Sequence, residues 1–143
     1  MPRVAFHVLS AGPHDARLRY ACRLAEESVE QGVRVYLLTA SHSDTQRVDD
    51  LLWTYNDRSF LPHEVFSGAP PSHERVMIML GEQPAPPSHR SLLINLTEAT
   101  PADLEAYAEI AEIVDVDPER KRTARDRYKQ YREHGCAPES KNV

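Results

Sequence analysis

The chain has 143 residues, of which 41% are hydrophobic and 27% are charged, a balance typical of a folded domain and too apolar for a disordered chain. No apolar run approaches the roughly 20 residues that a membrane span needs, and two distant cysteines exclude a disulfide scaffold or a zinc module built on cysteine pairs. The scarcity of cysteines favours a reducing compartment, so we expect a cytoplasmic protein without a membrane partner. The chain has a net charge of −5, and we expect one domain over residues 1–135 with a loose tail at 136–143.

Short apolar runs alternate with segments of helical periodicity along the chain. The runs that predict strands are Val4–Leu9, Val33–Leu38, Arg75–Leu80, Ser91–Leu96 and Ile113–Val116. The segments that predict helices are Leu18–Val29 with Gly32 as its stop, Ser43–Tyr55, Thr100–Ile110 and a basic segment from Pro118 onward. This alternation predicts an α/β fold of Rossmann-like, three-layer form, with a mostly parallel central sheet and helices on both faces. The proline-rich loop between Leu80 and Ser91 leaves no room for a helix, so the strands it joins are the candidate for an antiparallel pair.

The turn after the first predicted strand lacks the features of a nucleotide site. Dinucleotide binding there requires several glycines, so that backbone N–H groups can approach a pyrophosphate at a helix N-terminus. The turn has one glycine, Gly12, and the adjacent Pro13 has no N–H to donate. No G-x-x-x-x-G-K-[ST] sequence occurs anywhere in the chain. We therefore expect no nucleotide-binding loop and no cofactor.

Patterns typical of catalytic or metal sites are also missing from the sequence. The seven histidines are scattered, without a pair at helical ligand spacing, and no G-x-S-x-G nucleophile motif is present. Asp115 and Asp117 at a strand end could hold a metal for phosphoryl chemistry, but a strand exit followed by a helix cap explains them better. The sequence therefore predicts no catalytic residue and no metal ligand, and a protein that is not an enzyme.

The segment Asp117–His134 carries the strongest charge anomaly of the chain. Seven basic and four acidic residues give it a charge of +3, which leaves −8 for the remainder. Lys121, Arg125, Tyr128 and Arg132 are spaced i, i+4, i+7 and i+11, so they share one face of the predicted helix. Cations beside an aromatic ring can hold a peptide carboxylate while an apolar wall accepts a hydrophobic side chain. The alternative is a solvated helix end whose cations suit the helix dipole.

Trp53 marks a second candidate binding surface. It lies away from the centre of the apolar stripe of its predicted helix, where a tryptophan can anchor an interface. Phe60 and Leu61 follow shortly before Pro62, and the extended geometry favoured there sends these two side chains to opposite sides, so that one faces outward. The alternative is that Trp53 packs under the following loop.

Two segments make the sequence resemble the chi-subunit family of bacterial DNA polymerase III holoenzymes. They are Asp50–Trp53 followed by Ser59–His63, and Ala124–Arg132. The order and spacing of the elements agree over nearly the whole chain, although the segment after Gly135 departs from the family's pattern. The resemblance implies a Rossmann-like protein without a nucleotide site, acting as a non-catalytic connector in DNA replication.

The resemblance also implies two protein partners. Members of the family pair one-to-one with the psi subunit of the clamp loader, and a helicase of the DNA-repair type can compete for the same surface. The positions that match the psi-facing surface are Trp53 and Phe60, with Leu61 and Pro62 beside them.

The second implied partner is the single-stranded-DNA-binding protein, whose acidic C-terminal tail ends in phenylalanine. Lys121, Arg125 and Tyr128 match the positions that receive this tail, Val114 is the expected apolar wall, and Arg132 continues the same helix face. DNA would then be contacted only indirectly.

Two other functions remain open from the residues alone. The basic helix could bind single-stranded DNA directly, with its tyrosines as stacking platforms, although the charge of −8 on the remaining chain opposes this. An enzyme acting on a small phosphorylated compound rests on analogy of fold alone.

Overall fold

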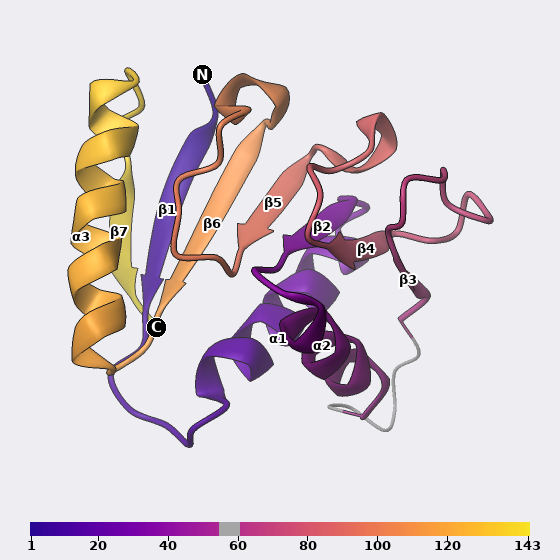
Figure 1. Cartoon of the computed structure of the whole chain (residues 1–143), viewed down its shortest axis with the longest axis horizontal. Coiled ribbons are helices and arrows are strands. Elements are labelled where there is room, and N and C mark those ends of the chain that lie inside the picture. Colours follow the sequence, from indigo (N-terminus) through magenta and orange to yellow (C-terminus); the bar gives the residue numbers. More distant parts are fainter. Residues whose placement is uncertain (55–60) are drawn as a thin grey trace.

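Seven parallel strands form one sheet at the centre of the structure, a computed structural model that describes residues 1–54 and 61–143 (Figure 1). Their order across the sheet is β3-β4-β2-β5-β6-β1-β7. In chain order the strands are β1 (Arg3–Val8), β2 (Val35–Leu38), β3 (His63–Val65), β4 (Ile78–Gly81), β5 (Leu92–Asn95), β6 (Glu109–Val114) and β7 (Glu139–Asn142). The predicted Rossmann-like α/β class is confirmed.

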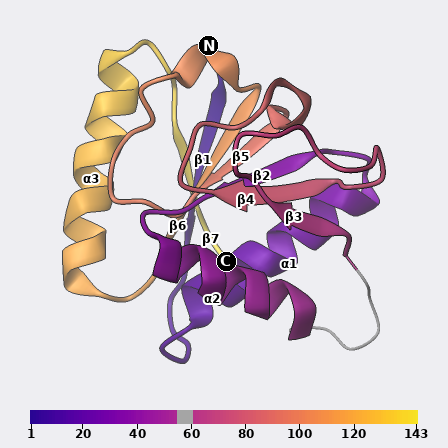
Figure 2. The same cartoon turned by 45° about the vertical axis from the view of Figure 1, so that its right-hand side comes forward.

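Helices cover both faces of this sheet, as expected for a three-layer fold. The helices are α1 (Ala16–Glu30), α2 (His42–Thr54) and α3 (Pro118–Glu133), with short 3-10 helices η1 (Pro87–His89) and η2 (Leu104–Ala106) in loops. Figure 2 shows α1 and α2 together on one side of the sheet and α3 on the other. Because both sides are covered, β2, β4 and β5 are buried along most of their length and are largely apolar.

Two hydrophobic cores result, one on each face of the sheet. Side chains alternate along β2, so Val35 and Leu37 belong to the core under α1 and α2, whereas Tyr36 belongs to the core under α3. All three side chains have no exposed surface. The α3 core also contains Phe6 and Tyr131, which become important for the site below.

The ends of the helices follow local signals in the sequence. The Asp117 carboxylate accepts a hydrogen bond from the Arg120 N–H at 3.1 Å and caps α3, as predicted. α1 ends at Glu30, two residues before Gly32, whose φ is +77°. α2 begins at His42, one residue before the predicted Ser43, and the Ser41 hydroxyl accepts from the Asp44 N–H at 3.1 Å.

The antiparallel pairing considered for β4 and β5 is wrong, because β2 lies between them and pairs in parallel with both. The proline-rich connection crosses from one strand to the other without an α-helix. The Tyr36 hydroxyl donates to the Gln83 carbonyl at 2.6 Å, and His89 Nε2 donates to the Val76 carbonyl at 2.7 Å. These bonds hold the loop against the core, so a short connection can serve a parallel crossover.

The helix predicted from Thr100 to Ile110 is also wrong. Only η2 is helical there, and β6 begins at Glu109, four residues before the strand predicted from Ile113. β6 pairs with β1 along its full length and with β5 on its other side. The two rows of backbone hydrogen bonds outweigh the local helix signals of Thr100 and Pro101.

The loose tail predicted after Gly135 is wrong for Glu139–Asn142, which form the edge strand β7. Gly135 has a φ of +91°, a left-handed conformation that reverses the chain after α3. β7 pairs in parallel with β1, and the Val143 N–H donates to the Val8 carbonyl at 3.0 Å. All four residues of β7 are exposed, so backbone pairing holds the strand and side-chain patterns do not reveal it.

Candidate functional site

A cavity of about 540 Å³ lies between α3 and the sheet, and we call it the α3 groove. It brings together all five residues that the sequence associated with peptide binding, which are Val114, Lys121, Arg125, Tyr128 and Arg132. Five further residues line it, which are Phe6, Val8, Ala124, Lys129 and Ser140. These five were not expected from the sequence, and Lys129 is the one that the helical spacing could have revealed, because it follows Arg125 by four residues.

The floor of the α3 groove is apolar and well packed. The ring of Phe6 lies 5.3 Å from the ring of Tyr128 and 5.9 Å from that of Tyr131, between centroids. Val114 and Ala124 are each 5% exposed and complete the floor. These side chains are fixed by the core beneath them, so the surface that they present is preformed.

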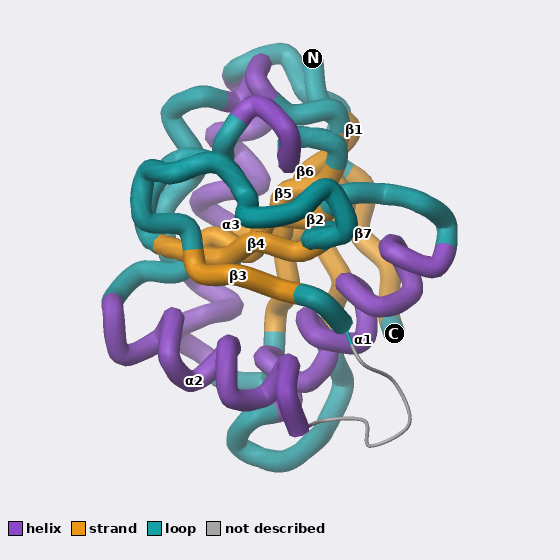
Figure 3. The backbone as a smooth tube through the Cα atoms, turned by 90° about the vertical axis from the view of Figure 1, so that its right-hand side faces the viewer, coloured by secondary structure: helices purple, strands orange, loops and turns teal. Residues whose placement is uncertain are grey.

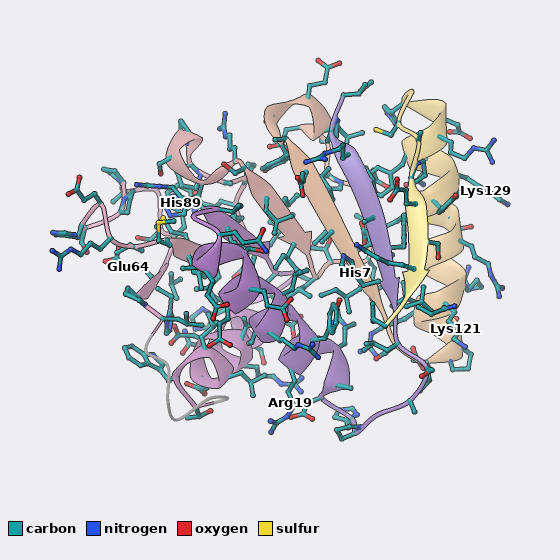
Figure 4. All side chains as sticks on the ribbon, turned by 180° about the vertical axis from the view of Figure 1, so that it is seen from behind. His7, Arg19, Glu64, His89, Lys121 and Lys129 are labelled. Atoms are coloured by element: carbon teal, nitrogen blue, oxygen red, sulfur yellow. The ribbon has the colours of Figure 1, made fainter. Side chains whose placement is uncertain are left out.

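The groove wall formed by α3 is cationic. Lys121, Arg125, Lys129 and Arg132 are all exposed, and their side chains make no hydrogen bond or ion pair with any described residue. In Figure 4, Lys121 and Lys129 project outward from α3. Unpaired cations above an apolar floor are suited to a carboxylate-rich peptide that also carries a hydrophobic side chain.

The other three basic residues of the segment are held in ion pairs. Arg120 Nη1 lies 3.0 Å from Asp115 Oδ2, and Arg122 pairs with Glu119 one turn away. Arg127 is 4% exposed, and its guanidinium donates to the buried carboxylate of Glu112. The charge of α3 is therefore divided between paired cations and the four unpaired cations of the groove, a division that counting charges in the sequence does not show.

A buried polar network fixes α3 on the sheet. Glu112 of β6 has no exposed surface, and its Oε1 accepts from Arg127 Nε at 3.1 Å. Its Oε2 accepts from the Tyr131 hydroxyl at 2.6 Å and from Asn95 Nδ2 at 2.8 Å. Burial raises the pKa of the Glu112 carboxyl, and the Arg127 guanidinium opposes that rise. This network was not expected from the sequence. Its signal is the glutamate in the otherwise apolar run Ile110–Val114, part of which was predicted to be helical.

The surface around Trp53 lies at the opposite edge of the sheet. Trp53 is 55% exposed on α2, and its ring centroid lies 4.6 Å from that of His63 on β3. Figure 3 shows β3 at this edge of the sheet with α2 beside it. Pro62 is half-buried, whereas Leu61 is 7% exposed and packs in the core, so Leu61 does not present its side chain to a partner. Phe60 lies outside the described residues.

The carboxyl edge of the sheet, where α/β folds usually bind nucleotides, carries carboxylates in place of phosphate-binding groups. At the start of α1, Asp15 accepts from Arg19 Nε at 2.6 Å, and at the start of α3, Asp117 is the cap. Asp115 pairs with Arg120 beside them. The arginines Arg19 and Arg120 and the Arg120 N–H are therefore already paired with carboxylates of the protein. The favoured interpretation of Asp115 and Asp117, as strand exit and helix cap, agrees with these contacts.

The described part of the chain has neither a candidate metal site nor a membrane-spanning helix. No three histidine, cysteine, aspartate or glutamate side chains among the described residues are grouped so that they could hold a metal ion. No helix within residues 1–54 and 61–143 is long and apolar enough to cross a membrane.

Fold and site together define a parallel α/β protein of Rossmann-like form, with carboxylates where nucleotide-binding relatives of the fold hold phosphate and a cationic groove along its last helix. The profile of the family described as "DNA polymerase III chi subunit, HolC" matches residues 1–139. The chain therefore belongs to the DNA polymerase III chi subunit family, and the resemblance seen in the sequence is confirmed.

Individual relatives agree with this assignment. The DNA polymerase III subunit chi of Pseudomonas aeruginosa is 38% identical over 135 residues, 94% of this chain and 92% of that protein. The corresponding subunits of Haemophilus influenzae and Escherichia coli are each 31% identical, over 86% and 80% of this chain and over 85% and 77% of those proteins.

A solved structure shares the fold at low sequence identity. The crystal structure of T4 UvsW aligns with 98% of this chain at a TM-score of 0.63 and 10% identity. This chain spans 41% of that one, and the likeness concerns the fold alone.

Proposed function

We propose that the protein is a non-catalytic, cytoplasmic adaptor of the DNA polymerase III holoenzyme. It links the psi subunit of the clamp loader to the acidic C-terminal tail of single-stranded-DNA-binding protein. The α3 groove receives the tail, and the surface around Trp53 contacts psi or a repair helicase that competes with it. DNA is reached through the binding protein. The observation that carries the proposal is the row of unpaired cations above the apolar floor of the α3 groove.

The groove matches the two chemical features of such a tail. Its aspartates and terminal carboxylate would pair with Lys121, Arg125 and the cations that follow, and its phenylalanine would lie on the floor formed by Phe6 and Val114. A small site of this kind gives about micromolar affinity, near −8 kcal/mol. Salt weakens it because the cations are exposed. Many tails on coated DNA restore a firm link by avidity while each contact stays exchangeable.

Direct binding of single-stranded DNA is less compatible with the tyrosines of α3. Base stacking requires an accessible aromatic face. Tyr131 has no exposed surface, and the Tyr128 ring packs on Phe6 while its hydroxyl donates to the Pro138 carbonyl at 3.0 Å. The cations remain, but Tyr131 offers no face for stacking, and Tyr128 offers only the part of its ring that lines the groove.

The test is a pair of fluorescence-anisotropy titrations at the same moderate salt concentration. One probe is a labelled aspartate-rich peptide that ends in phenylalanine, and the other is a labelled single-stranded oligonucleotide. We expect saturable binding of the peptide at micromolar concentration and none of the oligonucleotide. A peptide whose terminal phenylalanine is replaced by alanine serves as the control and should bind weakly. Saturable oligonucleotide binding without a response to the peptide would reverse the proposal.

A further inference from the structure

The α3 groove has a second wall, formed by the edge strand β7. We propose that β7 is a specificity-determining part of the groove, which stays in place when the acidic peptide binds, and that Tyr128 is a positioning residue that ties it to α3. This inference rests on the proposed function. It assigns a role to β7, a segment outside the helix whose spacing predicted the site. The match to the family model ends at residue 139, so most of β7 lies beyond that match.

The register of β7 determines which of its side chains face the groove. Ser140 pairs with Phe6 and Asn142 pairs with Val8, and both β1 partners line the groove. Paired residues on neighbouring strands point to the same face of a sheet. Ser140 itself lines the groove, as this alternation requires.

The two charged residues of β7 point the other way. Glu139 and Lys141 line a cavity of about 430 Å³ on the opposite face of the sheet, together with His7 of β1. β7 therefore presents small, uncharged side chains to the groove and directs both charges away from it. The cations of α3 thus face a wall that neither neutralises them nor repels a carboxylate.

Tyr128 joins the two walls of the groove. Its hydroxyl donates to the Pro138 carbonyl, at 3.0 Å, immediately before β7. Its ring lies against Phe6, 5.3 Å away between centroids. Because the hydroxyl donates its proton to the strand, Tyr128 acts on a peptide through its ring and through the position of β7.

The strand itself has little else to hold it beyond this bond and its pairing with β1. All four of its residues are exposed, and β7 lies beside α3 at the edge of the sheet (Figures 1 and 4). If β7 were absent, β1 would be the sheet edge and the groove would lose the wall that contains Ser140. An edge strand of this kind can open locally, so its contribution is measurable in the folded protein.

The first experiment compares Ser140→Glu with Lys141→Glu in the full chain, by titration with the aspartate-rich peptide that ends in phenylalanine. We expect Ser140→Glu to weaken binding about tenfold, because it places a carboxylate in the groove beside the peptide's own. Lys141→Glu changes the net charge by twice as much in the same strand but faces away. We expect it to change the affinity by less than about twofold. Equal effects of the two substitutions would overturn the inference.

Two further variants separate a local effect from loss of folding. Ser140→Lys should strengthen binding several-fold, a result that partial unfolding cannot produce, and unchanged or weaker binding would count against the proposed wall. Tyr128→Phe keeps the ring and removes the bond to Pro138. It should weaken binding several-fold and speed hydrogen exchange at the Val143 amide, which donates to Val8.

Hydrogen exchange also distinguishes a fixed strand from a displaced one. In the unaltered protein, the protection of the Val143 amide should stay equal or rise when the peptide binds. A fall would show that the peptide displaces β7 and would overturn the inference. If the peptide fails to bind the unaltered chain at all, the proposed function fails. If it binds and Arg125→Ala weakens it while both β7 substitutions behave alike, only the role of β7 is wrong.

Discussion

Arg125 lies between Lys121 and Lys129 along the α3 groove, and no described acidic residue pairs with its guanidinium. We expect Arg125→Ala to weaken binding of the acidic peptide by about 1–3 kcal/mol, because a charge-assisted anchor is lost. The fold should remain intact, since the side chain is exposed. Isothermal titration calorimetry measures the change.

Arg122→Ala is the matched control for that substitution. It removes the same charge from the same helix, but Arg122 is paired with Glu119 and does not line the groove. Its effect on affinity should be small at moderate salt. If both variants weaken binding equally, the helix attracts the peptide through its overall charge and Arg125 is not an anchor.

A second prediction at the residue scale concerns His7, which is buried on the face of β1 opposite to the groove. Burial, aided by the nearby Lys141, lowers its pKa from 6.5 to about 4. The unfolded chain therefore binds the proton more tightly than the folded chain, and the free energy of unfolding falls as the pH drops from 6.5 toward 4. His7→Gln removes this proton uptake, so its stability should decline less steeply over that range.

Urea unfolding at a series of pH values measures the difference for His7. The contribution of the other titrating groups is common to both proteins and cancels in the comparison. At pH values well above 6.5 the two curves should run parallel, because His7 is neutral in both the folded and the unfolded chain there. Parallel curves below that pH as well would show that His7 does not resist protonation in the folded protein.

At the scale of the element, α3 is anchored by the buried pair of Glu112 and Arg127. Glu112→Gln keeps the shape of the side chain but leaves the Arg127 guanidinium buried without its main partner. We expect the free energy of unfolding to fall by about 3 kcal/mol, the lower end of the range found when a buried ion pair loses one partner. The loss is not larger because Glu98 still lies 3.3 Å from Arg127 and partly balances its charge. Urea denaturation measures it.

The control for that prediction is an exposed ion pair on the same helix. Glu119→Gln removes the partner of Arg122, and both side chains are largely in solvent, so its effect on stability should be slight. Comparable losses in the two variants would mean that the Glu112 network does not hold α3 to the sheet.

The elements also show how far the sequence determines the fold. α3 was predicted with its start because Asp117 and Pro118 are local signals that act within one turn. The start of β6 was not, because its pairing partners in β1 lie about a hundred residues away. β7 was not predicted for a related reason, because a strand whose four residues are all exposed has no pattern of apolar residues. The candidate site shows the same limit of local signals. Its α3 residues were predicted from their helical spacing, whereas Phe6, Val8 and Ser140 come to the groove only because of how the strands are ordered in the sheet.

At the scale of the whole molecule, the two candidate surfaces lie at opposite edges of the sheet. β7 borders the α3 groove, and β3 lies beside Trp53 with five strands between them. At about 4.8 Å between strands, the edges are roughly 29 Å apart. That is several times the ~8 Å over which charges act at physiological salt. Two partners bound at these surfaces would therefore not disturb each other through their charge.

This separation predicts that a substitution at one surface leaves binding at the other surface unchanged. Trp53→Ala should abolish co-purification with the psi subunit and leave the affinity for the acidic peptide unchanged, because an aromatic anchor is lost from one surface alone. Arg125→Ala should do the reverse. The double variant should show each loss at the size found singly, since substitutions at distant sites add. Weaker peptide binding in Trp53→Ala, with its unfolding transition unchanged, would show that the sheet couples the two sites.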